Sequence, residues 1–439
     1  MKWVVMLMLA LPAPGLAAAD GARDRFGGWP EVRATATGYF HTEPIAGVWW
    51  LVTPDGDAFF CKGVSNVSYS ADVAPALGYA PYGRATQAKY GSADKWAAAA
   101  ADRLRGWGFN SVGAWSSPEM RTQHMPYVLI ANMAAGAPAY GPHGEWADFF
   151  APQFAVAVRK QAQELCAPHA DDPFLLGYFT DNELRWGPDW SSKTSLLDEF
   201  LALPAEAAGR QAAVALMRAR YTTVEALNTA LGTRLGSLDE LAKVTSLPAG
   251  TQAVKELQAA FHREYAHRYF EACREAILAA DPHHLVLGCR FNSYAPAPVA
   301  EAMGPYVDVV SINSYFTLPM KAQLTYLAAT TGKPVMVTEF SFKARDSGLP
   351  NTSGDGRPVA TQQDRADGFD NYVTALAKMP FVVGFHWFEY ADEPAEGRFD
   401  GENSNYGLVN IKDEPWQILV ERMTHVNAGL EVLHRAAAR

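Results

Sequence analysis

A repeated alternation of strand-like and helical segments constrains the fold of this chain most. Eight short runs rich in β-branched and aromatic residues end in polar residues, and Ala-rich helical segments lie between them. The runs are 59–64, 111–115, 127–132, 175–180, 285–289, 307–313, 334–338 and 382–387. Strands that alternate with helices form parallel sheets, so eight such units predict an α/β protein with a (β/α)8 TIM barrel. The alternative, an open doubly wound sheet, usually has fewer units and a glycine-rich first turn, which we do not find in this sequence.

Two segments depart from the regular pattern. Residues 47–61 contain two strand-like runs around a Pro-Asp-Gly turn, which predicts an N-terminal β-hairpin before the barrel. About a hundred residues with further helical patterns separate the fourth run from the fifth. We interpret about 190–255 as a helical insertion after strand 4. A separate domain is the alternative, although no Gly/Ser/Pro linker flanks this segment.

The N-terminus has the pattern of a secretory signal peptide. Lys2 precedes an apolar stretch, and three alanines at 17–19 follow. This apolar run is shorter than the roughly 20 residues that a membrane-spanning helix needs. We therefore predict a signal peptide at 1–19, an N-terminal segment at 20–46 and the barrel at 47–439, in a protein that is exported to the periplasm or the medium and has no membrane anchor.

The composition narrows the kinds of partner. The formal net charge is −10 and no run of Lys or Arg exceeds two, which argues against a nucleic-acid partner because phosphates bind to positive surfaces. The 12 Trp and 18 Tyr fit either core packing or surfaces that stack on sugars. The four cysteines are far apart and lack a CxxC spacing, which favours buried free thiols over a single bridge and suggests no zinc site.

Two glutamates follow predicted strands, at the end of a barrel where active sites lie. Glu183 comes after the fourth run and Glu339 directly after the seventh. Glycoside hydrolysis uses two carboxyl groups, one that protonates the leaving oxygen and one that attacks the anomeric carbon or activates water. A single glutamate would be an ordinary strand-end residue, whereas a pair at matching positions indicates a glycosidase. This chemistry needs neither a metal nor a cofactor, and the sequence has no GxSxG, Walker or HExxH motif.

These residues resemble a known group of enzymes. Asn182 with Glu183, and Glu339, look like the acid/base and the nucleophile of the clan A retaining glycoside hydrolases. Three segments are similar to the β-agarases of glycoside hydrolase family 50, namely 49–56 (WWLVTPDG), 176–187 (LGYFTDNELRWG) and 401–410 (GENSNYGLVN). The resemblance covers about 47–416. It implies a secreted enzyme that hydrolyses a β-linked galactan, such as agarose or its oligosaccharides, with retention of configuration.

The resemblance also implies roles for further residues. Asn182 would hydrogen-bond the sugar 2-hydroxyl. Tyr315 would donate to Glu339 and keep it ionised, or would be an aromatic residue of the cavity wall. Trp387 would form the floor under the sugar, and the adjacent His386 would contact a hydroxyl or simply be a barrel residue. Arg290 would replace an arginine that clan A enzymes often have at the second strand. The remaining candidate sugar contacts are Trp115, Trp186, Trp190, Asn66 and Glu389, with Asn403 and Asn405 in a late loop.

Other functions fit parts of the same pattern. For the tryptophans after strand ends, a packing role is the alternative to a sugar subsite. A β-galactosidase or a β-glucanase of the same clan would use the same pair of glutamates. A carbohydrate-binding barrel without catalysis would use the tryptophans and not the glutamates.

Overall fold

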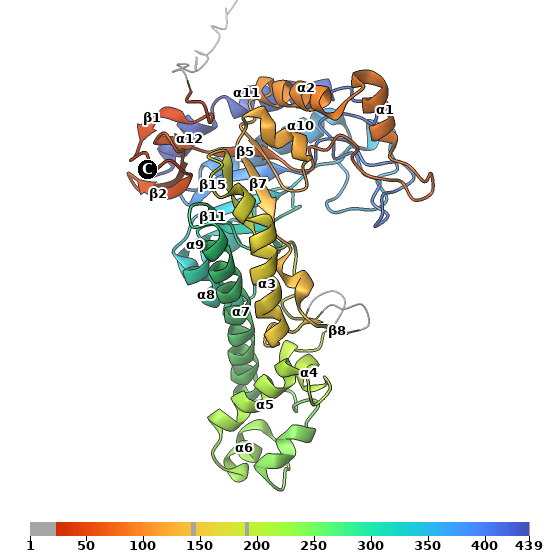
Figure 1. Cartoon of the computed structure of the whole chain (residues 1–439). Coiled ribbons are helices and arrows are strands. Elements are labelled where there is room, and N and C mark those ends of the chain that lie inside the picture. The colour runs from red at the N-terminus through yellow and green to blue at the C-terminus, as the bar shows by residue number, and fades with distance from the viewer. Residues whose placement is uncertain (1–22, 142–145, 189–192, 439) are drawn as a thin grey trace, which may run out of the picture.

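The computed structural model describes residues 23–141, 146–188 and 193–438, and the statements below concern these ranges. A broad part with both main sheets continues into a narrow helical part (Figure 1). The predicted signal peptide at 1–19 and the candidate Trp190 lie outside the described residues.

A small antiparallel sheet precedes the main one. Its strands are β1 (Trp29–Arg33), β2 (His41–Ile45), β3 (Val48–Val52) and β4 (Asp57–Phe59), in the order β1-β4-β3-β2. Strands β3 and β4 form the hairpin that the Pro-Asp-Gly turn predicts, and Gly56 in this turn has a φ of +93°. A Cβ at this position would lie 2.8 Å from the carbonyl oxygen of Ala34, so the turn requires glycine. Strands β1 and β2 were not predicted from the sequence.

The main sheet is parallel and has nine strands, with at least one in each of the eight predicted runs. They are β5 (Cys61–Val64), β6 (Ser111–Val112), β7 (Tyr127–Ile130), β10 (Leu175–Phe179), β11 (Leu285–Val286), β12 (Phe291–Asn292), β13 (Val310–Asn313), β14 (Val335–Glu339) and β15 (Val382–Trp387). The order is β11-β10-β7-β6-β5-β15-β14-β13-β12. The two end strands, β11 and β12, are separated by only residues 287–290, so the sheet curls until its ends meet in one stretch of chain.

Helices cover the outer face of this sheet. They are α1 (Pro81–Tyr90), α2 (Ala93–Gly106), α3 (Pro152–Leu165), α7 (Gln252–Ala280), α8 (Ala297–Met303), α9 (Lys321–Thr331), α10 (Gln362–Ala377), α11 (Gln417–Asn427) and α12 (Leu430–Arg435). In α2, Ser92 caps the first turn, and Trp96, Ala100 and Leu104 form one buried face at a spacing of four. Strands β10, β14 and β15 are buried throughout, as expected of a sheet covered on both faces.

The narrow part of the molecule lies between β10 and β11 in the sequence. It contains α4 (Leu196–Leu201), α5 (Ala208–Arg220) and α6 (Val224–Leu231), which pack on α7 (Figure 1). Helix α7 has 29 residues, a length of about 44 Å at the usual rise, and it runs back to the sheet. A short hairpin of β8 (Ala139–Tyr140) and β9 (Trp146–Ala147) lies beside it.

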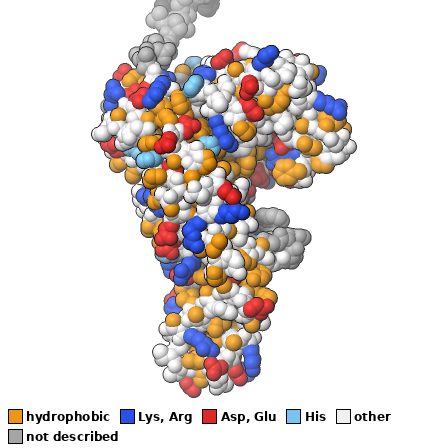
Figure 2. Space-filling view, in the orientation of Figure 1, with side chains coloured by type: hydrophobic (Ala, Val, Ile, Leu, Met, Phe, Trp, Pro, Cys, Tyr) orange, Lys and Arg blue, Asp and Glu red, His pale blue; other side chains and the backbone are white. Residues whose placement is uncertain are grey.

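All four cysteines fall within the described ranges, and each is buried and unpaired. No described helix is both long and apolar enough to cross a membrane. On the face in Figure 2, Lys and Arg side chains alternate with Asp and Glu and form no continuous basic patch.

Candidate active site

A cavity of about 410 Å³ brings the two predicted glutamates together. Glu339 is the last residue of β14, and Glu183 follows β10 by four residues. Both side chains therefore lie at the carboxyl end of the parallel sheet, where a functional site is expected. The other sequence-predicted residues that line this cavity are Asn66, Trp115, Asn182 and Tyr315.

Glu339 is buried between two donors. Its Oε1 accepts a hydrogen bond of 2.7 Å from Nη2 of Arg290, and its Oε2 accepts one of 2.8 Å from the hydroxyl of Tyr315. Burial raises the pKa of Glu339 above its usual value, while the Arg290 charge and the Tyr315 hydroxyl act in the opposite direction. Because both oxygens accept from strong donors, the hydrogen bonds favour the carboxylate form.

Glu183 has a different environment. Its Oε1 accepts from Nδ2 of Asn313 at 2.8 Å, and its Oε2 accepts from Nδ2 of Asn292 at 3.1 Å. Burial, followed by the negative charge of Glu339, raises the pKa of Glu183 to about 7, whereas the Asn313 hydrogen bond lowers it. A carboxyl group in this range can give and take a proton near neutral pH.

Arg290 connects the two glutamates. Its guanidinium donates to Glu339 and to the carbonyl oxygen of Thr338 at 2.9 Å, and its own carbonyl oxygen accepts from the backbone N–H of Glu183 at 3.2 Å. The guanidinium carbon lies 4.2 Å from the ring centre of Trp115. Arg290 is fully buried, with a φ of +52° in the stretch between β11 and β12. The break in the fifth strand therefore lets one residue bind the carboxylate of Glu339 through its side chain and the backbone of Glu183 through its carbonyl oxygen.

The structure keeps His386 and Trp387 out of the cavity. Successive side chains of β15 point to opposite faces of the sheet. His386 is buried inside the curled sheet, with Nε2 3.4 Å from Sγ of Cys61, and burial lowers its pKa to about 3. Trp387 points outward, packs against Phe369 of α10 and is fully buried. The next residue, Phe388, is one of the aromatic side chains that line the cavity.

Two further candidates also lie outside the cavity lining. Trp186 is 5% exposed and stacks on Phe270 of α7, with ring centres 5.5 Å apart, which is the packing role that the sequence left open. Glu389 is buried behind the cavity, where it accepts a hydrogen bond from Nδ2 of Asn66 and where burial raises its pKa. It contacts a lining residue and does not itself line the cavity.

The late-loop asparagines also make contacts within the fold. Asn405 is buried and donates to Asp392 at 2.8 Å. The side-chain oxygen of Asn403 accepts from the backbone N–H of Thr352 at 2.9 Å.

Sequence analysis missed several residues of the site. Asn292 and Asn313 end β12 and β13, so the rule that found Glu183 and Glu339, polar residues at strand ends, would have found them too. The other missed residues lie on long loops, where no periodic pattern marks them. They are Asp72, Asp355, Phe388, Arg398, Phe399, Asp400 and Glu402.

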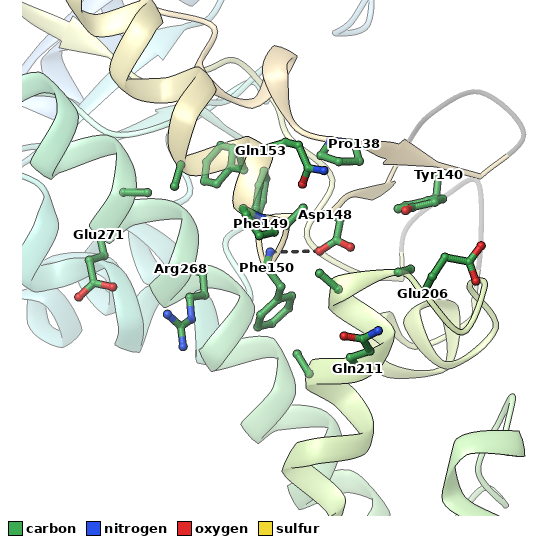
Figure 3. A pocket seen from close by; sticks show the side chains of 18 of the residues that line it. Pro138, Tyr140, Asp148, Phe149, Phe150, Gln153, Glu206, Gln211, Arg268 and Glu271 are labelled. Carbon is green, nitrogen blue, oxygen red and sulfur yellow. Dashed lines mark hydrogen bonds between the residues drawn. The ribbon is translucent and has the colours of Figure 1, made fainter.

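A larger cavity, of about 740 Å³, lies between α3, α5 and α7 (Figure 3). Its buried carboxylate, Asp148, accepts from the backbone N–H groups of Phe150 at 3.1 Å and Gly209 at 2.8 Å. This carboxylate thus connects the backbone at Phe150 to the backbone at the start of α5. The smaller cavity, with its pair of glutamates, is the better candidate for chemistry.

The site has no sign of a metal centre. Within residues 23–141, 146–188 and 193–438, no three or more His, Cys, Asp or Glu side chains form a group that could hold a metal ion.

The fold and the site together define an α/β protein with one buried and one half-buried carboxyl group, in contrasting hydrogen-bond environments, at one end of a parallel sheet. Over 94% of its length the chain is 30% identical to Beta-agarase B of Vibrio sp. (strain JT0107). It spans about half the length of the curated relatives that it matches, 50% in this case. No protein-family model matches the chain.

Solved structures show the same similarity. The crystal structure of an agarase, AgWH50C, has a TM-score of 0.85 and 28% identity, over 95% of this chain and 68% of that one. A structure described as an exo-beta-agarase has a TM-score of 0.87 and 27% identity, over 94% and 68% of the two chains. The chain is therefore similar in both sequence and fold to proteins described as agarases.

Proposed function

We propose that the protein is a secreted β-agarase-type glycoside hydrolase that cleaves a β-linked galactan, such as agarose or its oligosaccharides. The observation that carries this proposal is the pair of glutamates in one cavity. Glu339 is held by donors that favour its carboxylate form, and the pKa of Glu183 is raised to about 7. Two carboxyl groups with such separate properties match the division of labour in glycoside hydrolysis. The similarity to agarases supports the choice of substrate.

The proposed reaction is a double displacement. A carboxylate oxygen of Glu339 attacks the anomeric carbon while Glu183 gives its proton to the leaving glycosidic oxygen, so that the C–O bond breaks and a glycosyl ester forms. Glu183 then takes a proton from water, and the water oxygen displaces Glu339. The product keeps the β configuration, and both glutamates return to their starting forms.

Further residues support these steps. Tyr315 and Arg290 hold Glu339 in place for the attack. Asn182 is positioned by Nδ2 of Asn313 at 3.2 Å, and we assign it to the sugar 2-hydroxyl. The hydrogen bond between Asn182 and the sugar 2-hydroxyl strengthens as positive charge develops on the sugar ring in the transition state.

The proposal includes the architecture and the localisation that the sequence predicts. The curled sheet would close as a (β/α)8 barrel within 47–439, with the helical insertion at about 190–255 and an N-terminal segment at 20–46. A signal peptide at 1–19 would direct export. Cleavage of the chain after residue 19 in the secreted protein, found by N-terminal sequencing, is the expected result.

The test is hydrolysis by wild type, Glu339→Gln, Glu183→Gln and a surface control, Glu225→Gln, whose side chain is exposed on α6. We expect the first two variants to lose activity on agarose by at least about 10³-fold because each lacks an essential group. The control should match wild type. NMR of the first-formed product should show the β anomer.

The choice of substrates separates the alternatives. Agarose, laminarin and small aryl β-galactosides are given to wild type in parallel. Preference for laminarin or for the aryl galactoside would replace the agarase assignment with a β-glucanase or a β-galactosidase. Full activity of Glu339→Gln, or no hydrolysis of any β-glycoside, would overturn the hydrolase assignment.

A further inference from the structure

Phe399 is an exposed aromatic side chain at the rim of the candidate active site. It is 77% exposed and lines the cavity that contains Glu183 and Glu339. An apolar ring in this position contributes almost no buried area to the fold. Exposed apolar surface that borders a functional cavity is typical of a ligand contact.

A tight turn presents this ring. The N–H of Arg398 donates to the carbonyl oxygen of Glu402 at 2.9 Å, and the N–H of Gly401 donates to that of Arg398 at 3.0 Å. Gly401 has a φ of +88°, which glycine adopts without strain. The backbone that carries the ring is thus ordered before any ligand arrives, which lowers the entropic cost of binding.

Arg398 attaches the turn to the rest of the site. Its guanidinium forms ion pairs with Asp400 at 3.0 Å and Glu393 at 3.3 Å, and it also pairs with Glu402. The guanidinium carbon lies 5.4 Å from the ring centre of Phe399 and 5.5 Å from that of Phe388. Because Glu393 is fully buried, this network connects the exposed ring to the core.

The side chains around the Phe399 ring indicate what kind of ligand would bind there. Trp115, which is 40% exposed, lines the same cavity and offers a second aromatic surface. The carboxylates of Asp400 and Glu402, which pair with Arg398, line the same cavity and can accept further hydrogen bonds. A pyranose ring has an apolar C–H face and hydroxyl donors at its edge, so it matches both features. The surplus of negative charge disfavours sulfated or carboxylated sugars.

We propose that the turn at 398–402 is a separate sugar subsite, in which Phe399 stacks on a neutral pyranose ring of the substrate beyond the ring that reacts. This inference rests on the proposed function and adds to it a residue that determines the preference for longer, uncharged chains. Phe399 does not touch the reacting atoms, so it acts on binding and not on the chemical step.

The kinetic test compares Phe399→Ala with Phe399→Trp and with Tyr326→Ala, an exposed aromatic residue on α9 outside the cavity lining. For a neutral agaro-hexasaccharide, Phe399→Ala should raise KM about three- to tenfold with little change in kcat. The KM for a short aryl β-galactoside should not change. Phe399→Trp should restore the hexasaccharide KM, and Tyr326→Ala should match wild type.

A binding test separates this inference from the proposed reaction. In the Glu339→Gln background, calorimetry with the same neutral hexasaccharide should show weaker binding after Phe399→Ala, whether or not the protein is a hydrolase. A sulfated galactan hexasaccharide should bind more weakly than the neutral one. Equal affinity with and without the Phe399 ring, or an equal rise of KM for short and long substrates, would overturn the subsite.

Discussion

Glu183 and Glu339 carry the same functional group, and their neighbours make them chemically distinct. Glu339 faces a guanidinium and a phenol, whereas Glu183 faces two neutral amides. A full positive charge stabilises a carboxylate more than an amide dipole does. The pKa of Glu183, raised to about 7, suits the proposed general acid near neutral pH, and Asn313 acts on Glu183 as a positioning residue.

Replacement of Asn313 by Ala should shift the pH dependence of the proposed hydrolysis. The Asn313 amide stabilises ionised Glu183, so its loss raises the pKa of Glu183 above about 7. Glu183 then stays protonated to higher pH, and the basic limb of the kcat/KM profile should move upward on agarose. Arg218→Ala, on the exposed side of α5, serves as the control with an unshifted profile. A basic limb that stays in place or moves down would contradict the role of Asn313.

At the scale of elements, the sequence predicts the strands that have a regular hydrophobic pattern. Each of the eight predicted runs contains a strand because buried parallel strands are continuous apolar segments, whereas the ninth strand, β12, lies outside all of these runs. Strands β1 and β2 were missed because short, half-exposed edge strands lack such a signal. Trp387 was predicted to lie at the cavity. The structure differs because a shift of one residue along β15 moves a side chain to the opposite face of the sheet. The positions of Phe399 and Arg398 depend on loop conformation, which no periodicity encodes.

The start of α5 gives a prediction for one element. Helix α5 begins after Ala207, which has no side-chain cap, and Asp148 accepts the N–H of Gly209 from a distant part of the chain. Asp148→Ala would leave buried N–H groups unsatisfied, so we expect a loss of about 1–3 kcal/mol. Denaturant unfolding measures this loss, and amide hydrogen exchange should show it in α5 first.

The matched control for this element is Glu206→Ala, which changes an exposed carboxylate in the same cavity (Figure 3). It should leave both the unfolding free energy and the exchange of α5 unchanged. Equal effects of the two substitutions would show that Asp148 does not cap the helix.

At the scale of the whole molecule, a buried ion pair connects the two ends of the described chain. Oε1 of Glu431, on α12, accepts from Nζ of Lys62 at 2.7 Å and from Arg23 at 2.8 Å. Lys62 lies on β5, so the C-terminal helix is attached to the sheet and to the N-terminal segment. Both Lys62 and Glu431 are 2% exposed. The Lys62 charge lowers the pKa of Glu431 in opposition to burial.

Glu431→Gln should destabilise the protein by about 3 kcal/mol at neutral pH, because it leaves a buried lysine without a counter-charge. The folded-state pKa of Glu431 is depressed, so its stabilisation is present above its unfolded pKa of about 4.5 and is lost as pH falls below it. Unfolding free energies between pH 6 and pH 3 should therefore fall less steeply in the variant. Parallel curves for variant and wild type would contradict this assignment.

Because β11 and β12 are joined by one short stretch of chain, new chain termini are tolerated at some positions and not at others. New termini from a circular permutation within 287–290 would separate the two edges of the sheet and release Arg290 from both glutamates. New termini at 232–237, an exposed turn after α6, would leave every strand of the sheet intact. Split or permuted forms of the protein should therefore be designed in the helical part, away from the stretch that joins β11 to β12.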